Sequence, residues 1–217
     1  MIAIVDYGIG NLGSVTKGFR RAGAEVELSG DPEVLRRASA LVLPGDGAFG
    51  AAMAEIERRG LTLVLREAIE RGTPLLGICI GMQLLFEESE EHGQHRGLGV
   101  LPGRVLRFEG DLPVPHMGWN TLRARRAHPV LEGVADGAHV YFVHSFYCDA
   151  PDDVVIATSD YGREFPAIVG RGNVLGLQFH PEKSQAVGLW LVENFVRTVV
   201  SRRARPRKMT RHTEGAA

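Results

Sequence analysis

Short apolar runs that alternate with helix-like stretches constrain the fold of this chain more than any other feature. The runs are IAIVDY (2–7), AEVELS (24–29), ALVLPG (40–45) and PLLGIC (74–79). Between them, residues 11–23 and 48–72 show helical spacing, with a break near Gly60, and Asp31 before Pro32 marks another helix start. Strands that alternate with helices form parallel sheets, because each helix carries the chain back across the sheet. This half of the chain therefore predicts a parallel sheet flanked by helices.

After residue 97 the pattern changes to short strand-like segments separated by turns, followed by a helix over 185–201. The segments are GVLPGRVLRF, HMGWNTL, HVYFVHSFYC, VVIATSDY, FPAIVGRG and NVLGLQFH. Short strands joined by turns pair antiparallel. We expect them to be additions to the central sheet, so that residues 1–201 form one α/β domain.

The charges and cysteines exclude several classes of protein. Residues 202–217 hold six Lys or Arg and one Glu, which gives a charge of +5. Because the net charge of the whole chain is −1, residues 1–201 carry −6. We interpret 202–217 as a flexible basic tail rather than a nucleic-acid-binding segment, because the body is acidic. Two cysteines form neither a disulfide framework nor a zinc pattern, and no run of 18 apolar residues occurs. We expect no metal, no cofactor, no membrane contact and a cytoplasmic location.

The segment GIGNLG (8–13) matches the glycine pattern of dinucleotide-binding sites. In such sites the strand runs almost directly into the first glycine, whereas here Asp6 and Tyr7 intervene. A dinucleotide-binding fold would also begin its second mononucleotide-binding half after residue 97, where this chain has short antiparallel strands instead. We keep a dinucleotide-binding oxidoreductase as an alternative, and favour a tight loop that brings Asn11 towards another part of the structure.

Cys79 has the setting of a nucleophile. It is the central residue of GICIG (77–81), which has the form of the sharp strand-to-helix turn that exposes a nucleophile. A helix N-terminus favours the thiolate. For this segment alone, a buried cysteine acting as a small apolar residue is an equal alternative, and it is the one we adopt for Cys148.

A base and an orienting acid are present in QFHPE (178–182). Residues two apart in an extended chain point to the same side, so Glu182 can orient His180 towards Cys79. Oxyanion-hole donors are expected from the N–H of Ile80 and from the loop PGDG (44–47). The acid follows the histidine, unlike the order in α/β-hydrolases. Together these residues predict a Cys-His-Glu triad.

Three motifs resemble the class I (triad-type) glutamine amidotransferases, which have a flavodoxin-like fold: PGDGAFG (44–50), GICIGMQ (77–83) and QFHPEKS (178–184). Three more are similar to the glutaminase subunits of imidazole glycerol phosphate synthases: IVDYGIGNLGSV (4–15), PHMGWN (115–120) and YFVHSFY (141–147). The resemblance covers essentially residues 1–201. It implies that Cys79, His180 and Glu182 hydrolyse glutamine to glutamate and ammonia through a thioester.

The resemblance also implies roles for other residues. Gly47, Gln83 and the backbone of Ser145 and Phe146 would hold glutamine. The Gly45–Asp46 peptide would turn its N–H towards the oxyanion, although the family commonly has Val where Asp46 stands, and we assign no chemistry to this carboxylate.

A partner is implied as well: a separate (β/α)8-barrel cyclase that uses the ammonia to make imidazole glycerol phosphate in histidine biosynthesis. The residues expected to face it in a heterodimer are Asn11, Trp119, Tyr141 and Lys183. Two alternatives remain besides the oxidoreductase: the glutaminase of another amidotransferase, such as pyridoxal phosphate synthase, and a binding module with an inactive triad. His116 and His144 receive no catalytic role.

Overall fold

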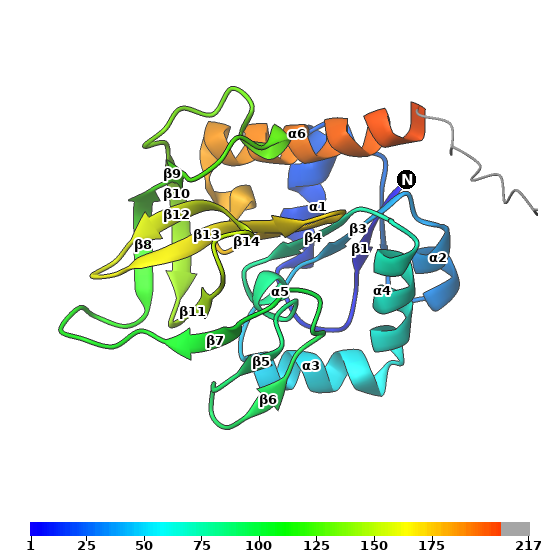
Figure 1. The fold of residues 1–217 in the computed structure, drawn as a ribbon. Helices are drawn as coiled ribbons and strands as arrows, with labels where there is room; N and C mark the ends of the chain where they lie inside the picture. The colour runs from blue at the N-terminus through cyan, green and yellow to red at the C-terminus, as the bar shows by residue number, and fades with distance from the viewer. Residues whose placement is uncertain (205–217) are drawn as a thin grey trace, which may run out of the picture.

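The computed structural model of the chain describes residues 1–204. Its central sheet has eight strands in the order β2-β1-β3-β4-β14-β13-β12-β9 (Figure 1). The parallel strands are β1 (Ile2–Val5), β2 (Val26–Ser29), β3 (Ala40–Leu43), β4 (Leu75–Ile78) and β14 (Val174–Leu177). The antiparallel strands are β13 (Glu164–Arg171), β12 (Val155–Asp160) and β9 (Arg123–Ala124). The expected α/β fold with a mostly parallel sheet is confirmed.

Helices cover both faces of this sheet. On one face lie α1 (Leu12–Arg21) and α6 (Gln185–Ala204); on the other lie α2 (Pro32–Arg37), α3 (Phe49–Arg58) and α4 (Leu61–Glu70) (Figure 1). The side chain of Asn11 accepts a hydrogen bond from Ser14 N at the start of α1, and Asp31 caps α2 through Glu33 N. Gly60, with φ of +68°, separates α3 from α4 where the break was predicted.

Two further sheets lie beside the central one. One pairs β8 (His116–Thr121) with β10 (His139–His144); the other has the order β11-β7-β5-β6, from β11 (Phe146–Asp149), β7 (Arg104–Arg107), β5 (Glu88–Ser89) and β6 (His95–Arg96). The expected antiparallel additions to the central sheet are present as β12 and β13. The segment of β14 instead pairs parallel with β4, and β7, β8, β10 and β11 lie in the two smaller sheets. The run HVYFVHSFYC divides at Ser145 between the two smaller sheets. Alternation along one strand does not specify its pairing partner.

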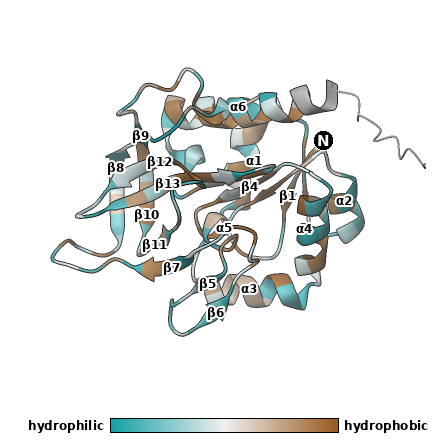
Figure 2. Cartoon of the chain, in the orientation of Figure 1, coloured by the Kyte–Doolittle hydropathy of each residue, from teal (hydrophilic) through white to brown (hydrophobic). Residues whose placement is uncertain are grey.

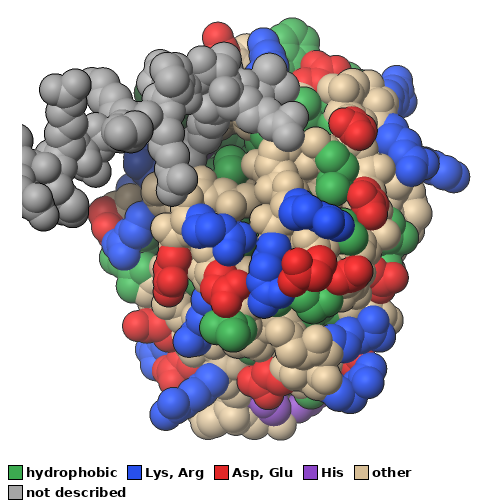
Figure 3. Space-filling view, turned by 90° about the vertical axis from the view of Figure 1, so that its right-hand side faces the viewer, with side chains coloured by type: hydrophobic (Ala, Val, Ile, Leu, Met, Phe, Trp, Pro, Cys, Tyr) green, Lys and Arg blue, Asp and Glu red, His purple; other side chains and the backbone are tan. Residues whose placement is uncertain are grey.

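The core lies where the parallel strands meet the helices. Every residue of β1, β3, β4 and β14 is buried, as expected for strands covered on both faces (Figure 2). The face shown in Figure 3 is different, with basic and acidic side chains interspersed. Ion pairs on α2, α3 and α4 include Arg36–Glu67 and Arg58–Glu55. This face has the mixed charge of a solvated surface rather than a basic stripe.

Helix α6 continues through Ala204, so the domain boundary expected at 201 falls within the helix. The rest of the predicted basic tail, 205–217, lies outside the described residues. No helix in the described part of the chain is long and apolar enough to cross a membrane.

Candidate active site

A pocket of about 260 Å³ lies beyond the carboxyl ends of the parallel strands. The segments after β3 and β4 line it, and the segment after β14 brings His180 beside Cys79. The junction between β10 and β11 also lines the pocket. The lining residues are Asp46, Gly47, Cys79, Ile80, Gln83, Glu91, Pro115, Val143, His144, Ser145 and Phe146. Ligand sites in open α/β sheets lie at this edge.

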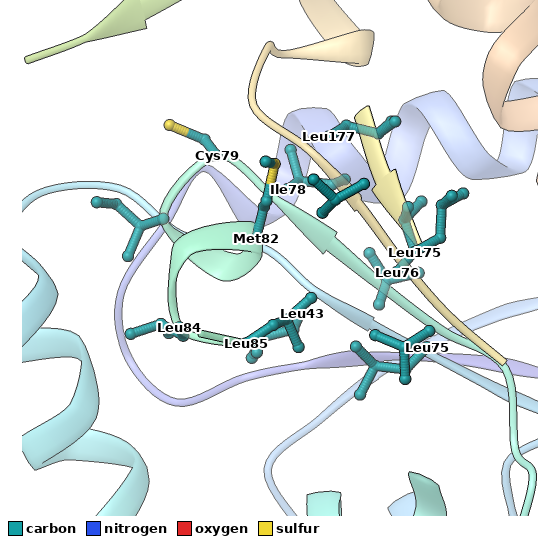
Figure 4. Close-up of a cluster of buried hydrophobic side chains, with 14 of the residues drawn as sticks. Leu43, Leu75, Leu76, Ile78, Cys79, Met82, Leu84, Leu85, Leu175 and Leu177 are labelled. Carbon is teal, nitrogen blue, oxygen red and sulfur yellow. The ribbon is translucent and has the colours of Figure 1, made fainter. Parts of the chain in front are cut away.

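Cys79 occupies a strained turn between β4 and α5 (Ile80–Gln83), with φ of 54° and ψ of −113°. Flanking glycines make the turn possible. A Cβ on Gly77 would lie 2.4 Å from the Gly81 carbonyl oxygen, and one on Gly81 would lie 1.8 Å from that of Leu43. Figure 4 shows Cys79 at the edge of an apolar cluster, with its sulfur directed away from the leucines. The predicted nucleophile-type turn is present.

Helix α5 has only four residues, so a long helix dipole does not act on the thiol. The N–H of Ile80 remains, as a first-turn donor outside the helical hydrogen bonds. Cys148 is fully buried in β11, and burial raises the pKa of its thiol well above the usual range. It has the setting of the apolar residue that was predicted.

His180 and Glu182 lie together in the segment that leaves β14. Nδ1 of His180 is 2.8 Å from Oε1 of Glu182, and both side chains are almost fully buried. Burial of the ring opposes protonation, but the nearby Cys79 and the hydrogen bond to Glu182 outweigh it and raise the pKa of His180 to about 10. The structure therefore brings the three predicted catalytic residues together, and Nε2 of His180 is buried without a hydrogen-bond partner among the described residues.

The loop after β3 lies against the Cys79 turn. A Cβ on Gly45 would be 2.6 Å from Cβ of Ile80 and 2.7 Å from the Gly81 nitrogen, so only glycine fits. The buried Tyr7 hydroxyl donates to the Pro44 carbonyl at 2.7 Å. A Cβ on Gly10 would lie 3.8 Å from Gly45, so the GIGNLG loop does reach the expected oxyanion peptide.

The predicted glutamine-binding residues line the same pocket. Nε2 of Gln83 donates to the Phe146 carbonyl at 3.0 Å and to Oε1 of Gln178 at 3.1 Å. Its Oε1 atom is buried and has no hydrogen-bond partner in the described part of the chain. Gln83 therefore presents an unused acceptor beside the pocket.

The orientation of the Phe146 peptide follows from the pairing of β11 with β7. Phe108 N–H donates to Ser145 O, and Phe146 pairs with Arg107. In an antiparallel pair, every second residue directs both its N–H and its C=O away from the partner strand. Phe146 is such a residue, so its N–H and C=O both face away from β7, on the side of Gln83.

Sequence reasoning missed two residues of this site. Gln178 Nε2 lies 3.9 Å from the Cys79 sulfur; it stands two residues before His180, so the spacing rule applied to His180 and Glu182 could have found it. Glu91 lines the pocket and accepts a hydrogen bond from Phe49 N at 2.6 Å. It comes from a polar turn distant in sequence, and nothing in its local pattern signals the site.

Three of the four expected partner-facing residues form one cluster. The Trp119 and Tyr141 rings meet edge to face at 5.9 Å, and Lys183 Nζ lies 6.0 Å from the Tyr141 ring centroid. Trp119 is 46% exposed. Asn11 caps α1, which packs against the turn that carries Lys183.

Hydrogen bonds tie this cluster directly to the triad segment. The Tyr141 carbonyl accepts the His180 N–H at 3.0 Å, and the Tyr141 N–H donates to Ser184 Oγ at 3.0 Å. Ser184 Oγ in turn donates to the His180 carbonyl at 2.6 Å. A displacement of β10 at Tyr141 would therefore act on the backbone of His180.

The raised pKa of His180 predicts a pH-dependent stability. The folded state retains the proton that the unfolded state releases near pH 6.5, so this contribution is complete below 6.5 and is lost as pH rises towards about 10. We expect the stability difference between the wild type and His180→Gln, measured by urea unfolding, to shrink across this range. A difference that stays constant would contradict a raised pKa for His180 in the folded chain.

Comparisons with known proteins agree with this geometry. The family model for class-I glutamine amidotransferases matches residues 3–199. The chain is 56% identical over 203 residues to "Imidazole glycerol phosphate synthase subunit HisH" of Geobacillus kaustophilus, covering 90% of this chain and 96% of the relative. It is 52% identical over 203 residues to the protein of that name from Salinibacter ruber, covering 90% and 93%.

A solved structure described as a glutamine amidotransferase superposes with a TM-score of 0.73 at 23% identity, covering 92% of this chain and 98% of the other. At this identity the likeness supports the fold alone.

Proposed function

Because the chain belongs to the class-I glutamine amidotransferase family, we propose that Cys79, His180 and Glu182 hydrolyse glutamine to glutamate and ammonia. The observation that carries this chemistry is the strained Cys79 turn beside the buried His180–Glu182 pair, opening on a pocket. His180 takes the proton of the Cys79 thiol, and the thiolate attacks the carbonyl carbon of the glutamine side-chain amide. His180 then gives its proton to the nitrogen as the C–N bond breaks, and ammonia leaves.

Hydrolysis of the resulting thioester completes the cycle. His180 takes a proton from water, the hydroxide adds to the thioester carbonyl, and the Cys79 thiolate leaves with glutamate as the product. Glu182 holds the imidazole in place throughout. The N–H groups of Ile80 and Asp46 stabilise the oxyanion, the second after the Gly45–Asp46 peptide turns inward.

The pocket supplies groups for the rest of the substrate. The Phe146 N–H is an available donor for the α-carboxylate, beside Ser145. The carboxylate of Glu91 and the unused Oε1 of Gln83 suit the α-ammonium group. Gly47, with φ of +79° and open space around it, leaves the pocket mouth clear.

We also propose that the chain is the glutaminase subunit of an imidazole glycerol phosphate synthase. It would pass ammonia to a cyclase with a (β/α)8-barrel fold, in the cytoplasm, as part of histidine biosynthesis. The names of relatives at about 50% identity support this assignment over the pyridoxal phosphate synthase type. The exposed cluster of Trp119, Tyr141 and Lys183 is the surface that we assign to the cyclase.

The dinucleotide alternative finds no support in the GIGNLG loop. The third glycine of that motif permits close packing of helix on strand, but a Cβ on Gly13 would meet nothing within 4 Å. The inactive-triad alternative is opposed by the His180–Glu182 pair beside Cys79.

The test of the proposed function is glutamate release from glutamine, measured with the chain alone and with the cyclase and its nucleotide substrate. We expect low activity alone and a rise of about tenfold or more in the complex. Activity that does not rise in the complex would overturn the assignment of the cyclase as partner. Absence of glutamate in both samples would overturn the assignment of glutaminase activity.

A further inference from the structure

His116 and His144 form a buried pair beside the pocket, and the proposed chemistry gives neither histidine a role. They are directly opposite each other at the end of the β8–β10 ladder. Nδ1 of His116 lies 2.9 Å from Nε2 of His144. Aromatic rings surround them: Phe142 and Tyr161 stack on His116, and Phe108 and Phe165 pack against His144.

The hydrogen bonds at the two ends of the pair fix the tautomer of each ring. Nδ1 of His144 lies 2.8 Å from the Phe146 carbonyl, which only accepts, so this nitrogen carries hydrogen. At the other end, Asn120 Nδ2 lies 3.2 Å from Nε2 of His116 and only donates, so that nitrogen accepts. Asn120 is oriented independently, since Nδ2 also donates to Asp160 O and Oδ1 accepts Thr121 N–H.

Both rings are therefore neutral and carry hydrogen on Nδ1, and every ring nitrogen has a partner. Burial supports this state, because it lowers the pKa of His116 to about 4 and that of His144 to about 3. The chain of donors runs from Asn120 through His116 and His144 to the Phe146 carbonyl. If packing were their only role, apolar side chains would fill this aromatic site without the cost of burying four polar nitrogens. The histidines therefore point to a role for their hydrogen bonds.

The end of this chain is the peptide that faces the pocket. The Phe146 carbonyl accepts from His144 and from Gln83, and its N–H lies on the same side of the strand. We propose that His116 and His144 are positioning residues for glutamine, holding the Phe146 peptide so that its N–H meets the α-carboxylate. This inference rests on the proposed glutaminase function and deepens it.

The kinetic test compares three variants in the complex with the cyclase and its nucleotide substrate. His144→Leu removes the donor to Phe146, and we expect KM for glutamine to rise about tenfold with kcat within about threefold. His144→Asn keeps an N–H near the position of Nδ1, and we expect KM within about threefold of the wild type. Phe165→Leu loosens the same aromatic packing without touching a hydrogen bond, and we expect it to lower stability but leave KM unchanged.

Equal rises in KM for the two His144 variants, or a comparable rise for Phe165→Leu, would show a packing role and overturn the proposal. A second readout does not need catalysis: ¹⁵N NMR of ring-labelled histidines at pH 7 in the wild-type chain. We expect both rings to be neutral Nδ1–H tautomers. A charged ring or an Nε2–H tautomer would overturn the chain of hydrogen bonds from Asn120 to the Phe146 carbonyl. A wild-type complex that releases no glutamate would instead refute the proposed function. The NMR spectra would still test the tautomers of His116 and His144 on which the chain of hydrogen bonds depends.

Discussion

Replacing Cys79 with alanine is expected to lower glutamate release by roughly 10⁴-fold or more while the chain stays folded. The thioester route requires this sulfur, and neither Gln178 nor Val143, which contact it, offers another nucleophile. The measurement is glutamate production in the complex with the cyclase, together with thermal unfolding of the variant. Without the sulfur, the oxyanion donors and the pocket remain but no covalent intermediate forms.

Cys148→Ala is the matched control, since Cys148 is the other cysteine of the chain and is also buried. It lies in β11 rather than at a strand-to-helix turn, and burial raises the pKa of its thiol. We expect glutamate release within about threefold of the wild type, and alkylation by iodoacetamide at Cys79 alone. Substantial turnover by Cys79→Ala would refute the assignment of the nucleophile.

Gly81→Ala is expected to have the largest effect on stability, lowering the free energy of unfolding by about 3 kcal/mol or more. The new methyl group would lie 1.8 Å from the Leu43 carbonyl oxygen and 2.8 Å from its carbon. Both atoms are backbone, so relief requires β3 and the Cys79 turn to separate. Differential scanning calorimetry should show a fall in Tm of roughly 6–12 °C, and any folded protein should have lost activity because the oxyanion loop moves.

Gly13→Ala is the control for this substitution. Gly13 lies in the first turn of α1 with nothing within 4 Å of its added Cβ, so alanine should stabilise the isolated chain by about 0.4–1 kcal/mol. Similar losses of stability in both variants would mean that the close contact at Gly81 is not the cause.

Much of the central sheet could be predicted because its signals are local. The runs at β1, β3 and β4 are uniformly apolar, Asp31 and Pro32 mark a helix start, and Gly60 breaks a helical stretch. The triad was also accessible from sequence. A glycine on each side of Cys79 signals a strained turn, and the two-residue spacing of His180 and Glu182 places both on one side of the chain.

What could not be predicted depends on pairing across the chain. The strands around Ser145 divide between two sheets because their partners, β8 and β7, lie far away in sequence. The two-residue strands β5, β6 and β9 have no apolar alternation to reveal them. Glu91 reaches the pocket, and His116 meets His144, only through this tertiary arrangement.

The most direct measurement follows the amide nitrogen itself. Glutamine labelled with ¹⁵N at the side-chain amide is supplied to the complex of this chain with the cyclase and its nucleotide substrate, in excess unlabelled ammonium. We expect ¹⁵N in the imidazole ring of the product, and loss of this label with Cys79→Ala. Unlabelled imidazole glycerol phosphate formed by the wild-type complex would contradict the transfer of ammonia from this chain to the cyclase.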